Sequence, residues 1–172
     1  MQNPMYIAIQ GDKQGNITAA CNTAASIGNA FQANYPDEST VKGYTHNITI
    51  PRDPLSGQPS GQRVHSPFVV TKLLDKSSPL LMSALVDGER LSTVTLRKYR
   101  TGTAGVLELF YTVTLIDAII LDINPDAPHI FGEMERDVAP LEHVSFSYRK
   151  IIWNHISGGT ETEDDWRQGV GA

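Results

Sequence analysis

The sequence of 172 residues has little cysteine and comparatively little basic charge. Its single cysteine, Cys21, cannot form an internal disulfide, so we expect an unreactive thiol, packed or exposed, and a fold that does not depend on an oxidising compartment. Fourteen Lys and Arg stand against 19 Asp and Glu, a formal net charge of −5, which repels phosphates on balance. These shortages argue against a disulfide-stapled scaffold and against nucleic acid as a partner.

Long apolar runs are also missing. The most apolar window, 115–123, is interrupted by Asp117 and Asp122, and it is far shorter than the ~20 residues that a membrane helix requires. The first six residues contain no basic cluster followed by an apolar run, so we expect no ordinary secretory signal. We therefore expect no membrane insertion, folding in a reducing cytosol and, if the protein leaves the cell, export by another machine.

The hydrophobic residues that are present, 40% of the chain, mostly alternate every second position, which is typical of half-buried strands. A phase shift at Ile116-Asp117 predicts a bulge or bend in a long strand, and long curved strands favour a barrel. We expect strands at 6–9, 16–19, 41–50, 63–74, 91–100, 107–123 and 144–148, a loop at 124–140, and a Gly-rich acidic tail from 157.

One segment, 75–88, predicts a short α-helix. Ser78 is a candidate N-cap, Pro79 suits the first helical position, and Gly88 suits a left-handed C-terminal stop. The apolar side chains expected to face the sheet are those of Leu81, Met82 and Leu85.

Motifs for catalysis, metals or cofactors are weak. The five histidines, His46, His65, His129, His143 and His155, show no HExxH spacing and no CxxC accompanies them. The stretch 57–61 lacks the Lys and Ser/Thr of a P-loop, and the acidic run 161–165 differs from an EF-hand. We therefore expect no catalytic residue, no metal and no cofactor.

The connector 51–62 is unusual, because its twelve residues exceed an ordinary hairpin loop. Its three prolines restrict the backbone and lower the entropy cost of ordering it against a partner. An interaction arm is favoured over an idle surface loop.

Several blocks of the sequence resemble the haemolysin-coregulated protein (Hcp) family, the inner tube of the bacterial type VI secretion system. They are Tyr6-Ile7-Ala8-Ile9-Gln10-Gly11, Ile50-Pro51-Arg52-Asp53-Pro54, the run 56–65, Asp75-Lys76-Ser77-Ser78-Pro79, Gly88-Glu89-Arg90-Leu91, Val144-Ser145-Phe146-Ser147-Tyr148 and Asp164-Asp165-Trp166-Arg167. Segments 34–38 and 124–140 depart from the family pattern or cannot be matched to it, so nothing is carried over to them.

The resemblance implies an all-β fold: a β-barrel of two sheets with one short α-helix and an extended β-hairpin arm. It also implies a homohexameric ring that stacks into a tube, with contractile sheath, spike and baseplate proteins as partners. Effector proteins would be carried or chaperoned in the lumen, and the tube would leave the cell through the type VI system. The barrel domain is expected at 1–160, and an acidic tail at 161–172.

Two sets of candidate contact residues follow from the resemblance and from ring geometry, because a closed ring repeats one heterologous contact and stacking requires a second. The arm residues, expected to reach an adjoining subunit or ring, are Pro51, Arg52, Asp53, Pro54, Gly57, Gln58, Pro59, Gly61 and Arg63. The ring-face candidates are Asp87, Gly88, Glu89, Ser157 and Gly158. Two alternatives stay open: another contractile-tail component such as a phage-like tail tube protein, and a small β-barrel hydrolase that uses one of the histidines.

Overall fold

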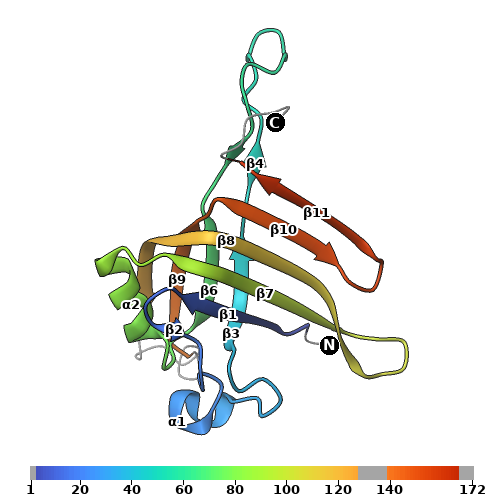
Figure 1. Ribbon diagram of the computed structural model, residues 1–172. Helices are drawn as coiled ribbons and strands as arrows, with labels where there is room; N and C mark the ends of the chain where they lie inside the picture. The colour runs from blue at the N-terminus through green and yellow to red at the C-terminus, as the bar shows by residue number, and fades with distance from the viewer. Residues whose placement is uncertain (1–2, 128–138, 167–172) are drawn as a thin grey trace.

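The computed structural model describes residues 3–127 and 139–166 of the chain (Figure 1). Strands dominate it, as predicted. In chain order the elements are β1 (Met5–Gly11), β2 (Gly15–Asn16), α1 (Ala24–Ile27), a 3-10 turn η1 (Gly28–Ala30), β3 (Ser39–Thr45), β4 (Ile48–Thr49), β5 (Val64–His65), β6 (Phe68–Leu73), α2 (Ser78–Asp87), β7 (Leu91–Thr101), β8 (Leu107–Asp126), β9 (Leu141–Ser147), β10 (Lys150–His155) and β11 (Thr160–Asp165).

The main sheet closes on itself. Its antiparallel order runs β8-β7-β1-β3-β6-β9, and β9 pairs back to β8, while β10 and β11 extend the sheet from the first half of β8. The 20 residues of β8 include one segment for each of two partner strands: 111–116 pair with β10, and 119–126 pair with β9. The change of partner falls at Asp117, which has a left-handed φ of 52°, so the predicted bend at Ile116-Asp117 is confirmed.

The core lies inside this barrel because apolar side chains alternate inward along each strand. The members of this core that are buried almost completely include Ile7, Ile9, Phe68, Val70, Val94, Leu96, Val113, Leu115, Val144 and Phe146. The predicted β-barrel is therefore confirmed. The second sheet is the β4–β5 pair, which forms the predicted hairpin arm.

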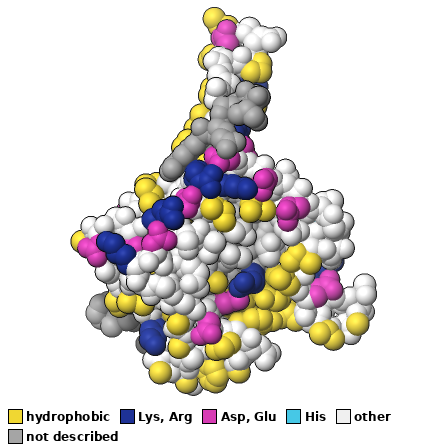
Figure 2. Space-filling view, in the orientation of Figure 1, with side chains coloured by type: hydrophobic (Ala, Val, Ile, Leu, Met, Phe, Trp, Pro, Cys, Tyr) yellow, Lys and Arg dark blue, Asp and Glu magenta, His cyan; other side chains and the backbone are white. Residues whose placement is uncertain are grey.

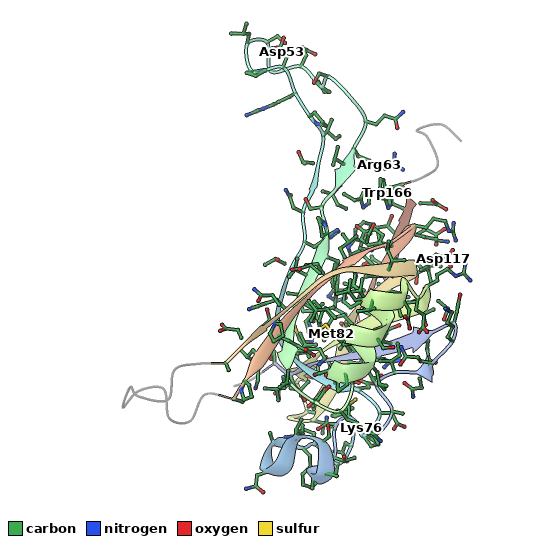
Figure 3. The ribbon with its side chains drawn as sticks, turned by 90° about the vertical axis from the view of Figure 1, so that its left-hand side faces the viewer. Asp53, Arg63, Lys76, Met82, Asp117 and Trp166 are labelled. Carbon is green, nitrogen blue, oxygen red and sulfur yellow. The ribbon has the colours of Figure 1, made fainter. Side chains whose placement is uncertain are left out.

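Helix α2 packs against the barrel, and two details of its prediction are wrong. Its N-cap is Ser77 rather than Ser78, although Gly88 adopts the left-handed conformation that was predicted to end it. The buried face is formed by Leu81 and Ala84, whereas Met82 is 37% exposed on the helix (Figure 3). The buried stripe that includes Leu81 continues three residues later, at Ala84. Met82 follows Leu81 directly and is therefore rotated by about 100° around the helix axis, off this stripe.

Other segments differ from the predictions as well. Residues 124–126 belong to β8 rather than to a loop, and Thr160–Asp165 form β11, which pairs with β10, rather than part of a tail. The short α1 and η1 have no counterpart in the sequence prediction. Predicted features within 128–138 and 167–172, including His129, lie outside the described residues. Among the described residues, no helix has the length and apolarity needed to cross a bilayer.

Candidate interaction arm and the network at its base

The connector between β4 and β5 stands out from the barrel as a narrow projection (Figures 1 and 2). Its two sides pair: Ile48 and Thr49 face His65 and Val64 in antiparallel register. Further out, Arg52 and Pro59 form an isolated bridge. The backbone N–H of Ser60 donates to the Pro51 carbonyl oxygen at 2.8 Å. The connector is therefore an ordered hairpin along its length rather than a loose loop.

The tip of the arm is fixed by Asp53. Its carboxylate accepts the backbone N–H of Leu55 at 2.9 Å and the hydroxyl of Ser56 at 3.1 Å. The Gly57 N–H donates to the Asp53 carbonyl at 2.9 Å, and the left-handed φ of Gly57, 72°, is the conformation that glycine adopts without strain. The hydrogen bond from the Leu55 N–H, and then that from Ser56, lower the pKa of the Asp53 carboxyl group. Asp53 thus shapes the tip, where it lies in Figure 3.

The arm presents apolar side chains to solvent. Every residue from 47 to 62 is exposed, and Leu55 at the tip is 98% exposed. Ile50 and Val64 are also exposed large hydrophobic residues of the arm. Exposed apolar groups on an ordered projection are typical of surfaces that bind a partner.

At its base the arm is joined to the far end of the sheet. The Arg63 guanidinium binds the Asp164 carboxylate through two bonds, Nε–Oδ2 at 2.5 Å and Nη2–Oδ1 at 2.7 Å. Arg63 also donates to the backbone carbonyl of Asp165 at 3.2 Å. A bidentate Arg–carboxylate pair fixes orientation as well as distance, so β11 holds the second strand of the arm in place.

Two histidines and a tyrosine extend this contact. His65 places Nε2 at 2.8 Å from Asp164 Oδ2 and Nδ1 at 2.7 Å from the Tyr148 hydroxyl. The same hydroxyl lies 2.6 Å from His46 Nε2. Trp166 stacks on the His65 ring at 5.6 Å and donates its indole N–H to the Tyr148 carbonyl. We call the six residues His46, Arg63, His65, Tyr148, Asp164 and Trp166 the base network; Arg63 and Trp166 mark it in Figure 3.

Hydrogen bonding and burial shift the pKa values of three residues in the base network. Hydrogen bonding from Arg63, and then from His65, holds the pKa of Asp164 below its ordinary value of 3.8. Burial raises the pKa of Tyr148, so its hydroxyl stays protonated. Burial, reinforced by the nearby His65, lowers the pKa of His46 from 6.5. The network is thus built around a charged Asp164 and an uncharged His46.

We expect Asp164→Asn to lower the melting temperature at neutral pH. Because the pKa of Asp164 is lower in the folded chain, its ionised form adds stability that is present above pH 3.8 and is lost as the pH falls through the depressed value. Thermal unfolding at a series of pH values should therefore show a difference from the parent protein that shrinks in acid. Asp126→Asn, at an exposed position on β8, serves as the matched control; an equal effect there would refute the assignment.

The structure separates the predicted contact residues into distinct places. The arm carries all of them from Pro51 to Gly61, while Arg63 lies at its base and binds Asp164 of its own chain. Asp87 and Gly88 are exposed where α2 ends. Glu89 is only 4% exposed, and a Cβ at Gly11 would lie 2.1 Å from its Oε2, so its side chain is not part of the chain's surface.

Ser157 and Gly158 are exposed in the turn between β10 and β11, on the opposite side of the barrel from α2 in Figure 1. Ser157 accepts a hydrogen bond from Arg100 at 3.1 Å, and the Gly158 N–H donates to His155 at 2.9 Å. The turn is therefore tied both to β7 and to its own strand.

The acidic run 161–165, expected from the sequence to be part of a tail, has basic partners that the sequence did not reveal. Arg63 and Arg149 bind Asp164 and Asp165, and Lys150 binds Glu163 at 2.9 Å. Arg149 also belongs to a belt of alternating charge below the arm, visible in Figure 2, which runs through Asp12, Arg90, Asp117, Arg149 and Asp165. The sequence of β11 contains no apolar residue and therefore no alternation that would signal a strand.

The histidines of the described residues are occupied by such structural bonds. His46 and His65 share Tyr148, His143 bonds to the Thr71 hydroxyl at 2.8 Å, and His155 accepts from Gly158. His155 Nδ1 also lies 3.4 Å from the Ser157 hydroxyl, but this nitrogen accepts the Gly158 N–H at 2.9 Å and the hydroxyl oxygen accepts from Arg100. Among the described residues, these bonds do not position a serine or cysteine as a nucleophile beside a histidine base. The geometry gives the hydrolase alternative no support.

Comparison with known proteins agrees with this fold along almost the whole chain. A family model described as "Type VI secretion system effector, Hcp" matches residues 6–155. The chain is 49% identical over 170 residues to the "Major exported protein" of Pseudomonas aeruginosa, which covers 99% of both chains. A solved structure described as "Crystal structure of Hcp protein" superposes with a TM-score of 0.93 at 46% identity, covering 98% of this chain and 100% of that one.

A second solved structure, the secreted protein Hcp3 from Pseudomonas aeruginosa, has a TM-score of 0.81 at 43% identity and covers 97% of this chain and 100% of that one. The sequence and the overall fold thus agree with one set of relatives. The chain belongs to the Hcp family of the type VI secretion system, a family of structural, secreted tube proteins.

Proposed function

We propose that the chain assembles into a homohexameric ring, that the rings stack into the inner tube of a type VI secretion system, and that the arm carries a contact between copies. The observation that supports this most strongly is the arm itself: an ordered hairpin, anchored by the base network, whose tip residue Leu55 is 98% exposed. A rigid arm loses little conformational entropy when it docks.

The placement of the ring-face candidates is compatible with stacking. A tube that grows by heterologous contacts requires complementary surfaces on different sides of each copy. Asp87 and Gly88 end α2 on one side of the barrel, and Ser157 and Gly158 form a turn on the other (Figure 1). Small and charged side chains of this kind make modest, reversible contacts, which suit a tube that comes apart after delivery.

We further propose that the tube works with contractile sheath, spike and baseplate proteins and carries effector proteins in its lumen. It would be assembled in the cytoplasm and exported by the type VI machine itself. A relative that is 49% identical bears the name "Major exported protein", which supports the export part of this proposal.

Leu55→Asp should weaken self-association and leave the fold intact. Because Leu55 contacts almost nothing in its own chain, we expect the free energy of unfolding to change by less than about 0.5 kcal/mol. A charge buried at a docked apolar tip is costly, so sedimentation velocity should show smaller species at the same concentration. If the variant sediments as the parent does, the tip takes no part in assembly. Leu55→Met, which keeps the apolar character, is the matched control.

A further inference from the structure

The base network contains a continuous hydrogen-bonded chain between the arm and the barrel. It runs from Asp164 through His65 and the Tyr148 hydroxyl to His46, with successive distances of 2.8, 2.7 and 2.6 Å. His46 precedes β4 and His65 ends β5, so both sides of the arm contribute. Asp164 belongs to β11, and Tyr148 follows β9. This series of hydrogen bonds therefore determines how the arm is attached to the sheet.

The direction of each bond in this chain can be assigned from its ends. The ionised Asp164 only accepts, so His65 donates from Nε2, and a neutral His65 then accepts at Nδ1. The Tyr148 O–H fills that acceptor, and His46 donates from Nε2 to the Tyr148 oxygen. With both histidines neutral, every donor in this series of hydrogen bonds faces an acceptor.

One added proton is tolerated. A proton on His65 Nδ1 is donated to the Tyr148 oxygen, the Tyr148 O–H turns toward His46 Nε2, and His46 moves its own proton to Nδ1 through solvent exchange. The imidazolium of His65 then lies beside the Asp164 carboxylate at 2.8 Å. Charge and hydrogen bonds both remain satisfied.

A second proton breaks this pattern. It places N–H groups of both His46 and His65 against the single Tyr148 oxygen and leaves the tyrosine O–H without an acceptor in the network. The two rings, with centroids 6.3 Å apart, would then both be cations beside Arg63. Among the residues that the structure describes, Asp164 is the one anion bonded to them. The neighbouring Asp165 carboxylate is bound by Arg149. Phe68 and Trp166, which pack on His46 and His65, add no charge.

We propose that the base network is a proton-sensitive hinge, which holds the arm in one direction while at most one of His46 and His65 is protonated and releases it when both are. Its consequence for assembly rests on the proposed function of the arm. The lowered pKa of His46 agrees with the hinge: a buried imidazole of lowered pKa contributes stability that is present above pH 6.5 and is lost as the pH falls toward the lowered value.

The test measures the direction of the arm within one chain. Spin labels on Leu55→Cys at the arm tip and Val86→Cys on α2, both highly exposed positions, report the tip-to-barrel distance by pulsed electron resonance. Cys21 is buried and stays unlabelled. Labelled chains are diluted into excess unlabelled chains, so that only distances within a chain are recorded. We expect a narrow distribution at about pH 8 and a broader one at about pH 4.5. The lower value lies well below 6.5, as the lowered pKa of His46 requires, and above the pKa of Asp164.

Three variants distinguish protonation of the base network from a general loosening of the fold in acid. His46→Phe removes the second protonation site, so its distribution should stay narrow at both pH values. Tyr148→Phe removes the shared oxygen and should broaden it at both. His143→Gln changes a histidine on β9 whose ring nitrogen bonds to Thr71, and it should behave as the parent does.

An unchanged distribution in the parent, or equal broadening in His46→Phe, would overturn the hinge. Sedimentation of the unlabelled proteins at the same two pH values tests its consequence separately. If the distance distribution broadens at low pH while sedimentation does not change, the result supports the hinge. It would then contradict the proposed role of the arm as a contact between copies.

Discussion

Replacing Lys72 with methionine should lower the free energy of unfolding by about 3–5 kcal/mol, because it leaves buried carboxylates without their cation. Lys72 is 1% exposed on β6. Its ammonium group lies 3.1 Å from the Asp75 carboxylate, donates to the Leu73 carbonyl at 2.9 Å, and bonds directly to Glu142 on β9. Methionine has a similar length and leaves no large cavity, so the loss reports the charge rather than the packing.

The surrounding hydroxyls make this cluster a joint between the barrel and α2. Ser77 donates to Asp75 at 2.5 Å, and Ser78 donates to Glu142 at 2.8 Å, at the point where the helix begins. Urea unfolding monitored by circular dichroism measures the change. Lys76→Met, four residues away at an exposed position labelled in Figure 3, is the matched control and should cost less than about 0.5 kcal/mol.

A triple variant distinguishes charge from shape at this site. Adding Asp75→Asn and Glu142→Gln to Lys72→Met removes both uncompensated carboxylates, and it should recover part of the lost stability. If the single variant unfolds at the same urea concentration as the parent, the buried ion cluster does not hold α2 to the barrel.

Shortening the arm should abolish self-association while the barrel stays folded. The paired residues are Thr49 and Val64, so replacing 51–62 with Asn-Gly leaves Ile50 and Arg63 flanking a two-residue turn of the type that closes antiparallel hairpins. Arg63 and its bonds to Asp164 are kept. Since every residue removed is exposed, we expect the melting temperature to stay close to that of the parent.

The readout for the shortened arm is mass and shape together. Size-exclusion chromatography with light scattering should show the monomer at concentrations where the parent assembles. A control variant that keeps the length, with Pro51, Pro54 and Pro59 changed to alanine, should assemble more weakly than the parent because its arm is less ordered before docking. If the shortened chain forms rings as readily as the parent does, the arm is not required for assembly.

Much of the barrel could be predicted from sequence, because apolar residues alternate along its strands. The ion cluster carried a similar signal that was not used. Lys72 lies in phase with Phe68 and Val70, and Glu142 lies in phase with Val144 and Phe146. Charges in phase with core residues on two strands predict that those strands pair with the charges opposed, as the observed Lys72–Glu142 register shows.

The base network could not be predicted in the same way. His65 and Asp164 are separated by 99 positions, and they meet only because β11 extends the sheet to the foot of the arm. The β11 sequence, Thr160–Asp165, contains no apolar residue and therefore no alternation to indicate a strand. Its position depends on tertiary ion pairs with Arg63 and Arg149, which local patterns do not encode.

Native mass spectrometry of the purified protein, with negative-stain imaging of the same sample, tests the central claim most directly. The account predicts a dominant species at about six times the monomer mass, seen as open rings, for the intact chain, and its loss in the chain with the shortened arm. A strict monomer at high protein concentration would contradict the assignment of this arm-bearing barrel as a self-assembling ring.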